Sequence, residues 1–290
     1  MFYVGLTLGT LTAGLIQSAA SKNLDGSNGL AGWRWMFIIT SVITLPLGLV
    51  GFFIWPGTPG KPSRRFLSQK ELELAKTRLK RSGVQSNANE FNWKLIGRIF
   101  SDWKIYVLTI WDMFFWNGCI NSSSGGYLLW LKSLNRYSTS KLNNLSTISP
   151  ALGIFYVLFI CFGSDLFLGR AGAITVAHVI NIIGLIILTV WNVPEAAKWF
   201  AFNTTYFSVA MSSVLYGWAN DILKHDVEER AITLIIMNAI AQSTTAWTPL
   251  LVFKTAEAPR FRKGYPFVAA NAGCLIIMTW IVRYLHKKQE

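Results

Sequence analysis

The sequence has 290 residues, of which 52% are hydrophobic and only 14% are charged. Soluble globular domains carry roughly 25% charged residues, so this composition excludes an ordinary water-soluble fold. The net charge of +13 would suggest nucleic-acid binding in a soluble chain, but here the basic residues lie between long apolar runs. We therefore expect a protein embedded in the lipid bilayer, with no nucleic-acid partner, whose lysines and arginines lie near an anionic membrane surface.

Apolar runs of about 20 residues, the length that an α-helix needs to cross a bilayer, repeat along the chain. They predict an all-α integral membrane fold with about eight transmembrane helices. The expected spans, in chain order, are residues 2–20, 36–55, 105–131, 142–164, 171–191, 199–223, 231–253 and 264–285.

A polar stretch between the second and third spans, residues 56–104, is the one long segment expected outside the membrane. It should contain a helix over Ser68 to Arg81, because Ser68 followed by Glu71 is typical of a capping box. The stretch is rich in lysine and arginine, which indicates the cytoplasmic side. With that orientation, both termini of this chain are also expected in the cytoplasm.

No motif of enzymatic chemistry occurs in the sequence. We find no nucleophile elbow, metal-binding helix, phosphate loop or dinucleotide fingerprint. The three cysteines, Cys119, Cys161 and Cys274, lie singly in apolar runs and predict neither a disulfide framework nor a zinc site. We therefore expect no enzymatic activity, no metal and no cofactor.

Asp112 interrupts the third span, where an isolated carboxylate is costly unless it is protonated, paired or hydrated. One hypothesis makes Asp112 a cavity group or proton-binding site. The other makes it an acid near the cytoplasmic end of the span, paired with a neighbour such as Lys104. Its position close to the start of the span favours the second hypothesis.

The outer half of the same span is polar and ends in Gly125-Gly126, which are expected to loosen or break the helix. Asn238 and Gln242, four residues apart in the seventh span, should share a helix face that looks inward. These polar groups either contact a substrate or join helices to one another, and the sequence leaves both open. The candidate cavity residues are Asp112, Trp116, Asn117, Asn121, Asn238 and Gln242.

Two ordered blocks of residues carry a family resemblance. The first is Gly29-Leu-Ala-Gly-Trp33-Arg34-Trp35, followed after a span by Trp55-Pro-Gly-Thr-Pro59. The second comprises Tyr216-Gly-Trp-Ala-Asn220-Asp221, Glu228-Glu-Arg230, Asn238, Ala246-Trp247-Thr-Pro249 and Ala258-Pro259-Arg-Phe-Arg-Lys-Gly264. The blocks resemble the sixth, tenth and eleventh helix regions of major facilitator superfamily permeases. They are most similar to the allantoate permease branch of anion:cation symporters, which includes fungal vitamin and organic-anion permeases.

The resemblance implies an N-terminally truncated permease that covers family helices five to twelve. Residues 1–55 then form the last two helices of the N-terminal bundle, residues 56–104 a basic cytoplasmic linker, and residues 105–290 a complete six-helix C-terminal bundle. The implied activity is proton-coupled symport of a small organic anion across the plasma membrane, driven by the proton gradient. A carboxylate vitamin such as pantothenate or biotin, allantoate and a sulfur-containing anion are all compatible substrates. The alternatives are a transport-inactive remnant and a regulatory partner of a full-length permease.

Two groups of charged residues lie in short loops that are expected on the cytoplasmic side. By the resemblance, Asp165 and Arg170 match the acidic-basic gating loop of such permeases, where their pairing would latch the cavity shut; plain anchoring of the topology is the alternative. Helix capping explains part of the second group, because its acids begin the next helix. This cytoplasmic charge cluster comprises Asp221, Glu228, Glu229 and Arg230.

Overall fold

The computed structural model describes residues 2–55, 57–58, 61–62, 68–81 and 93–289, and at residues 2–3, 58, 61–62, 79–80 and 121–123 it describes the backbone alone. Helices make up almost all of this part of the chain, as predicted. The exception is one short antiparallel pair, β1 (Gly57–Thr58) with β2 (Lys61–Pro62), in which Gly57 lies opposite Pro62.

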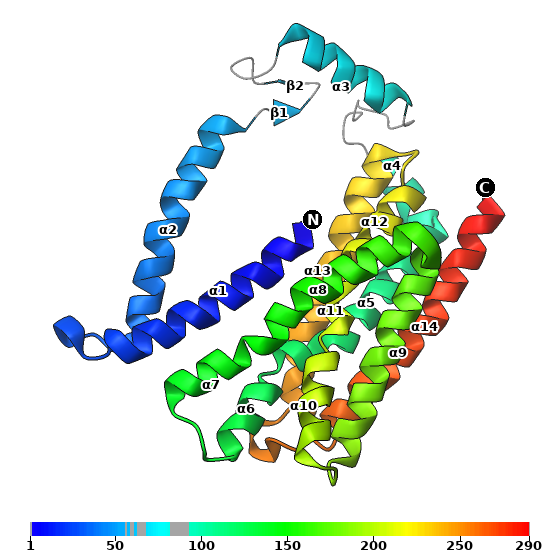
Figure 1. The fold of residues 1–290 in the computed structure, drawn as a ribbon. Helices are drawn as coiled ribbons and strands as arrows, with labels where there is room; N and C mark the ends of the chain where they lie inside the picture. The colour runs from blue at the N-terminus through cyan, green and yellow to red at the C-terminus, as the bar shows by residue number, and fades with distance from the viewer. Residues whose placement is uncertain (1, 56, 59–60, 63–67, 82–92, 290) are drawn as a thin grey trace.

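The first two helices, α1 (Phe2–Asn23) and α2 (Gly32–Ile54), are joined by a 3-10 turn over Ser27–Gly29. The turn is fixed by the Asp25 carboxylate, which accepts a hydrogen bond from the Gly32 amide at 2.7 Å. Helix α1 lies across the rest of the molecule and packs mainly on α7 (Thr139–Ser146) and α8 (Ile148–Gly163). Helix α2 extends away from the rest of the molecule (Figure 1).

Two helices lie in the polar segment that follows. The first, α3 (Gln69–Arg81), begins with the predicted capping box: Glu71 Oε2 accepts from the Ser68 amide at 2.9 Å and from its hydroxyl at 2.8 Å. These two hydrogen bonds lower the pKa of the Glu71 carboxyl, the backbone one contributing most. The second, α4 (Trp93–Ser101), was not predicted, because its apolar positions are separated by basic residues in a stretch read as linker.

The remaining helices form a bundle in which α5 (Trp103–Ser123) packs against α13 (Val227–Val252) and α14 (Gly264–Gln289), and α14 packs against α9 (Gly169–Val190). Three predicted spans are broken into shorter helices. The additional helices are α6 (Gly126–Ser133), α7 (Thr139–Ser146), α8 (Ile148–Gly163), α10 (Glu195–Thr204), α11 (Phe207–Ala210) and α12 (Ser212–Ile222), with a π-helical turn η2 (Ser164–Leu168) and a 3-10 turn η3 (Thr255–Glu257).

The break expected in the third span is present between α5 and α6. Gly125 has a φ of 71°, a left-handed conformation that glycine adopts without a steric penalty, and it ends one helix and starts the next. Among the described residues, three stretches are long and apolar enough to cross a membrane by length and composition: Gly32–Ile54, Thr139–Val190 and Gly264–Gln289. The other predicted spans correspond to helices that carry more polar side chains.

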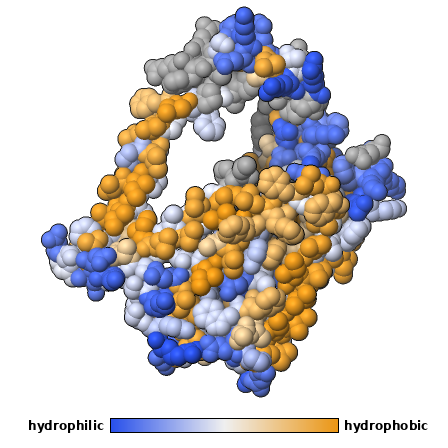
Figure 2. All heavy atoms as spheres, viewed as in Figure 1, coloured by the Kyte–Doolittle hydropathy of each residue, from blue (hydrophilic) through white to orange (hydrophobic). Residues whose placement is uncertain are grey.

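Two apolar cores hold the bundle together, one at each end. In the first, the Trp111 ring meets the Trp218 ring edge-to-face at 5.6 Å, and its indole N–H donates to Thr279 Oγ1 at 2.9 Å. In the second, aromatic rings from α6, α10 and α14 and from the segments that follow α9 and α13 cluster around Tyr265 and Phe202. The outer faces of the helices are largely hydrophobic, as Figure 2 shows, which suits a lipid environment.

Candidate functional site

The centre of the candidate site is a hydrogen-bonded group on one face of α5. Asp112 is fully buried, and its Oδ2 accepts a hydrogen bond from the Tyr216 hydroxyl at 3.1 Å. The same hydroxyl oxygen accepts from the Trp116 indole N–H at 2.8 Å and from Asn238 Nδ2 at 3.2 Å. Tyr216 therefore joins three of the predicted cavity residues, and we call these four side chains the Tyr216 network.

Asp112 forms no ion pair with any residue that the structure describes. Its expected pairing with Lys104 is wrong, because Lys104 Nζ instead contacts Asp102 and Glu229, each at 2.9 Å. Two helical turns separate Lys104 from Asp112, which places the amine at the end of the bundle and the carboxyl inside it. Within the described structure, Asp112 Oδ1 is buried without a hydrogen-bond partner.

Two more predicted cavity residues lie near this network in sequence, Asn117 on α5 and Gln242 on α13. Asn117 is buried and joins α5 to α13, since its Nδ2 donates to Thr244 Oγ1 at 2.8 Å. Gln242 is exposed, and its Oε1 accepts from Thr245 at 3.3 Å. The side chain of Asn121 lies outside the described residues. The structure thus joins Asp112, Trp116 and Asn238 in one hydrogen-bonded network, to which Asn117 and Gln242 do not belong, although Gln242 and Trp116 line the same cavity.

A cavity of about 400 Å³ lies beside the Tyr216 network, between α1 and the bundle. Trp116 links the two, because its indole is part of the cavity wall while its N–H reaches Tyr216. The wall consists of uncharged side chains: Leu6, Thr7, Thr10, Trp116, Cys119, Tyr206, Val209, Gln242 and Thr245. Asp112 therefore lies one hydrogen-bonded residue behind the wall.

A separate buried polar pair lies between α5 and α9. Asn181 Nδ2 donates to the Gly118 carbonyl at 3.0 Å, and the His178 ring lies 6.4 Å from the Phe115 ring, edge-to-face. Both His178 and Asn181 are fully buried. A Cβ added to Gly118 would lie 3.5 Å from His178, an ordinary van der Waals distance, so the packing here does not require glycine.

The predicted charge cluster is divided between two helices, with Asp221 on α12 and the other three residues on α13. Asp226 caps α13 by accepting from the Glu228 and Glu229 amides at 3.0 and 2.9 Å, which confirms a capping role for this loop. Two ion pairs join this end of α13 to α4 and α5. Arg98 of α4 pairs with Asp226 at 2.6 Å, and Lys104 of α5 pairs with Glu229 at 2.9 Å. Glu228 lies 3.8 Å from Arg98, and Arg230 takes no part in the ion pairs of the described chain.

Electrostatics at the start of α5 follow from these contacts. Partial burial of Lys104 opposes its charge, but hydrogen bonds and Coulombic attraction from Glu229 and Asp102 prevail and raise the pKa of its amine. Burial likewise opposes the charge of Asp102, whose pKa is nonetheless lowered by the Lys104 amide and ammonium. This end of the bundle is therefore held by charged pairs, whereas the Tyr216 network carries one carboxyl and neutral partners.

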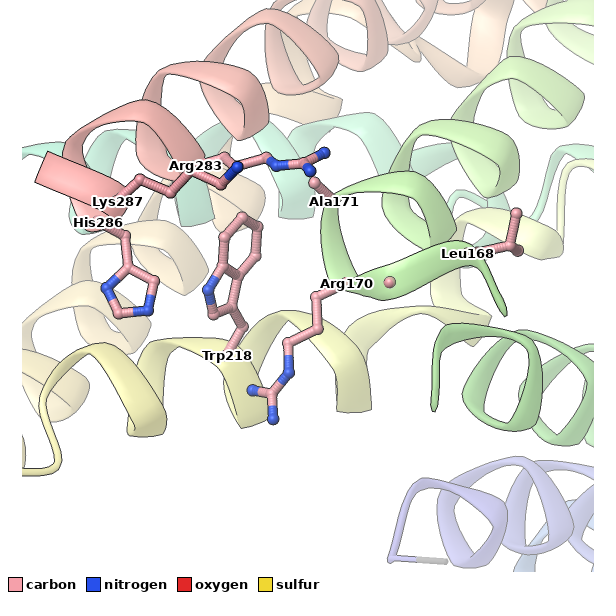
Figure 3. Close-up of a pocket in the computed structure, with 8 residues that line it drawn as sticks. Leu168, Arg170, Ala171, Trp218, Arg283, His286 and Lys287 are labelled. Carbon is pink, nitrogen blue, oxygen red and sulfur yellow. The ribbon is translucent and has the colours of Figure 1, made fainter. Parts of the chain in front are cut away.

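The expected pairing of Asp165 with Arg170 is not formed. Arg170 forms an ion pair with Asp221 of α12, and Asp165 is exposed on the π-helical turn η2. Gly169, with a φ of 65°, redirects the chain between the two residues, so Arg170 leaves the start of α9 toward α12 (Figure 3). Arg170 from the predicted gating loop and Asp221 from the predicted charge cluster thus pair with each other.

Sequence reasoning missed Tyr216, although this residue begins one of the blocks that carry the family resemblance. Part of the site could be found from helix periodicity, because Asp112 and Trp116 are four residues apart and share one face of a helix. The tyrosine lies 104 residues away from Asp112 in sequence, so only the tertiary packing joins them.

Among the described residues, no group of His, Cys, Asp or Glu could hold a metal ion.

Comparisons with known proteins give a consistent result. Residues 1–249 match the profile of the Major Facilitator Superfamily. The chain is 39% identical to the Vitamin H transporter of Saccharomyces cerevisiae, over 100% of this chain and 50% of that protein. It is 31% identical to the pantothenate transporter liz1 of Schizosaccharomyces pombe, over 98% of this chain and 55% of that protein. It is 28% identical to the pantothenate transporter FEN2 of Saccharomyces cerevisiae, over 98% of this chain and 56% of that protein. The chain spans about half the length of these curated relatives.

Proposed function

Because the chain belongs to the Major Facilitator Superfamily, we propose that it carries a small organic anion across the plasma membrane together with protons. The family and the relatives named above are transporters, so the chain is not an enzyme. The observation that carries the proposal is the buried Asp112 carboxyl, connected through Tyr216 to Trp116 in the wall of a cavity.

The cavity suits a small carboxylate. Its volume of about 400 Å³ falls within the roughly 300–1,000 Å³ typical of small-molecule sites. Hydroxyl groups and the Gln242 amide in its wall can donate hydrogen bonds to a carboxylate, and no charged side chain lines it among the described residues. An anion in this cavity therefore lacks a fixed countercharge, and a second negative charge nearby would repel it.

Protonation of Asp112 gives the anion no countercharge, but it removes a negative charge close to the cavity. An ionised carboxylate that is buried without a cation is costly, so the carboxyl favours a proton while the site is closed to water. When an anion occupies the cavity, a proton on Asp112 removes the repulsion between two negative charges. Release of the anion and hydration of the site then favour release of the proton, which couples the two movements.

The substrate class we favour is a vitamin carboxylate of the biotin or pantothenate type, with allantoate and sulfur-containing anions as further compatible substrates. The names of the relatives support the first choice, since they refer to vitamin H and to pantothenate, and the low polarity of the cavity wall suits a partly apolar molecule. The Arg170–Asp221 pair would hold α9 to α12 in one state of the cycle and separate in another.

Uptake by this chain alone tests the proposal. The purified chain is reconstituted in liposomes, and accumulation of radiolabelled biotin and pantothenate is measured with and without an inward proton gradient. We expect accumulation of at least one of them only with the gradient. If neither label accumulates above the level of protein-free liposomes, the chain does not transport these vitamins, and if labelled allantoate and sulfate also fail to accumulate, the inactive or regulatory alternatives hold.

A further inference from the structure

A second cavity, of about 250 Å³, lies at the end of the bundle that holds the last turns of α14, and none of its lining residues belongs to the Tyr216 network. It is lined by the first turn of α9, by Trp218 of α12 and by the last turns of α14 (Figure 3). Its basic side chains are Arg170, Arg283, His286 and Lys287, and we call this cavity the basic pocket. We propose that the basic pocket binds a phosphate group, either the headgroup of an anionic phospholipid or free phosphate.

The charge of the lining supports an anionic ligand. Arg170, Arg283 and Lys287 contribute three cations, and the described residues that line the pocket include no carboxylate. The nearest acid is Asp221, which contacts Arg170 from outside the lining and offsets one of the three charges. Two cations from a single helix therefore face one cavity with a surplus of positive charge.

The geometry of the donors suits phosphate. The Arg283 guanidinium lies 4.9 Å from the centre of the Trp280 ring, a contact that limits its freedom while leaving its N–H groups in their planar fork. Such a fork matches two phosphate oxygens at once. The pocket also contains Gly169, Arg170 and Ala171, the beginning of a 22-residue helix, where the backbone dipole favours an anion.

The surroundings of the pocket place it at the level of lipid headgroups. Phe167 and Tyr284, which flank it on η2 and α14, are large and 70% and 69% exposed. Lys288, beyond it on α14, is exposed as well. Figure 2 shows the same change along the molecule, from hydrophobic helix surfaces to a hydrophilic end near the C-terminus. A phospholipid bound there would place its phosphate in the basic pocket and its acyl chains against the aromatic surface.

A matched pair of double variants tests the proposal. Arg283→Gln with Lys287→Gln removes two cations that line the pocket, and Arg262→Gln with Lys288→Gln removes two exposed cations that do not. Binding to the purified full chain in detergent is measured by native mass spectrometry and by calorimetry. The probes are dioctanoyl phosphatidic acid, inorganic phosphate and, as a zwitterionic control, dioctanoyl phosphatidylcholine.

The wild type should bind phosphatidic acid more tightly than phosphatidylcholine. The Arg283→Gln, Lys287→Gln variant should lose about tenfold or more in affinity, because charge-assisted contacts to phosphate are lost, while the control variant should bind within about twofold of the wild type. Competition by inorganic phosphate identifies free phosphate as a sufficient ligand, and its failure to compete identifies the lipid. The proposal is overturned if the wild type binds no anionic probe, if the pocket variant binds like the wild type, or if both variants lose affinity equally. Because these measurements involve no transport, they stand apart from the test of the proposed function.

Discussion

Helices α2 and α14 have similar lengths and are both apolar enough to cross a membrane, yet their surroundings differ completely. The most apolar stretch of α2 contains no buried residue, and Phe52 is 80% exposed. Helix α14 packs against α5 and α9 and buries Leu275, Thr279 and Val282. Hydropathy therefore identifies helices that belong in lipid, but it does not tell which of them pack into a bundle.

The largest expected effect on stability contrasts the core of the bundle with α2. Trp111→Ala should lower the free energy of unfolding by about 3–5 kcal/mol, because it leaves a cavity and removes the partner of Thr279. Phe52→Ala should change it by less than about 0.5 kcal/mol, since this ring has no buried contacts to lose. Thermal unfolding of both variants in detergent measures the difference. Similar losses in the two variants would show that α2 is packed as tightly as the bundle.

The next largest effect concerns transport. Asp112→Asn keeps the side-chain volume but can no longer bind and release a proton, so gradient-driven accumulation of the labelled anion should fall by about tenfold or more. Exchange of labelled for unlabelled anion, which needs no net proton movement, should persist. Glu73→Gln, which removes an exposed carboxylate of α3, is the matched control and should transport like the wild type. Normal accumulation by Asp112→Asn would remove this residue from the mechanism.

A smaller effect is expected where α13 meets the start of α5. Lys104→Met removes a cation whose side chain is only 14% exposed and leaves Glu229, 12% exposed, without its partner. The free energy of unfolding should fall by about 1–3 kcal/mol. Arg136→Met, which breaks an ion pair with side chains about half exposed, should cost less than about 1 kcal/mol. Chemical denaturation of both variants measures the two losses, and a larger loss in Arg136→Met would contradict this ranking.

The smallest effect is the pH dependence of the same ion pairs. The pKa of Asp102 is lowered from an ordinary value of 3.8, so its contribution to stability is present above that pH and is lost as the pH falls through the folded value. The pKa of Lys104 is raised from 10.5, so its contribution is present below that pH and is lost as the pH rises through the folded value. Wild type and Lys104→Met should therefore differ most in melting temperature between these limits. If the difference in melting temperature between the two proteins stayed constant into strong acid, the stabilising role given to the Asp102–Lys104 pair would be contradicted.

The sequence was sufficient for the features that depend on local chemistry. Long apolar runs predicted the helices, Ser68 and Glu71 predicted the start of α3, and Gly125-Gly126 predicted the break after α5. The pairing of charges could not be predicted in the same way, because Arg170 pairs with Asp221 of α12 and Lys104 pairs with Glu229 of α13, and both acids are distant in sequence. Tyr216 was missed for the same reason, since its role depends on α12 packing against α5.

The central claim is that Asp112 exchanges a proton as the anion crosses the bundle, and the movement of protons tests it most directly. A pH-sensitive dye is trapped inside liposomes that contain the purified chain, and biotin or pantothenate is added outside with no preset gradient. The account predicts that the anion acidifies the interior of wild-type liposomes and leaves the pH unchanged with Asp112→Asn. Uptake of the labelled anion by the wild type without any acidification, or equal acidification by both proteins, would contradict it.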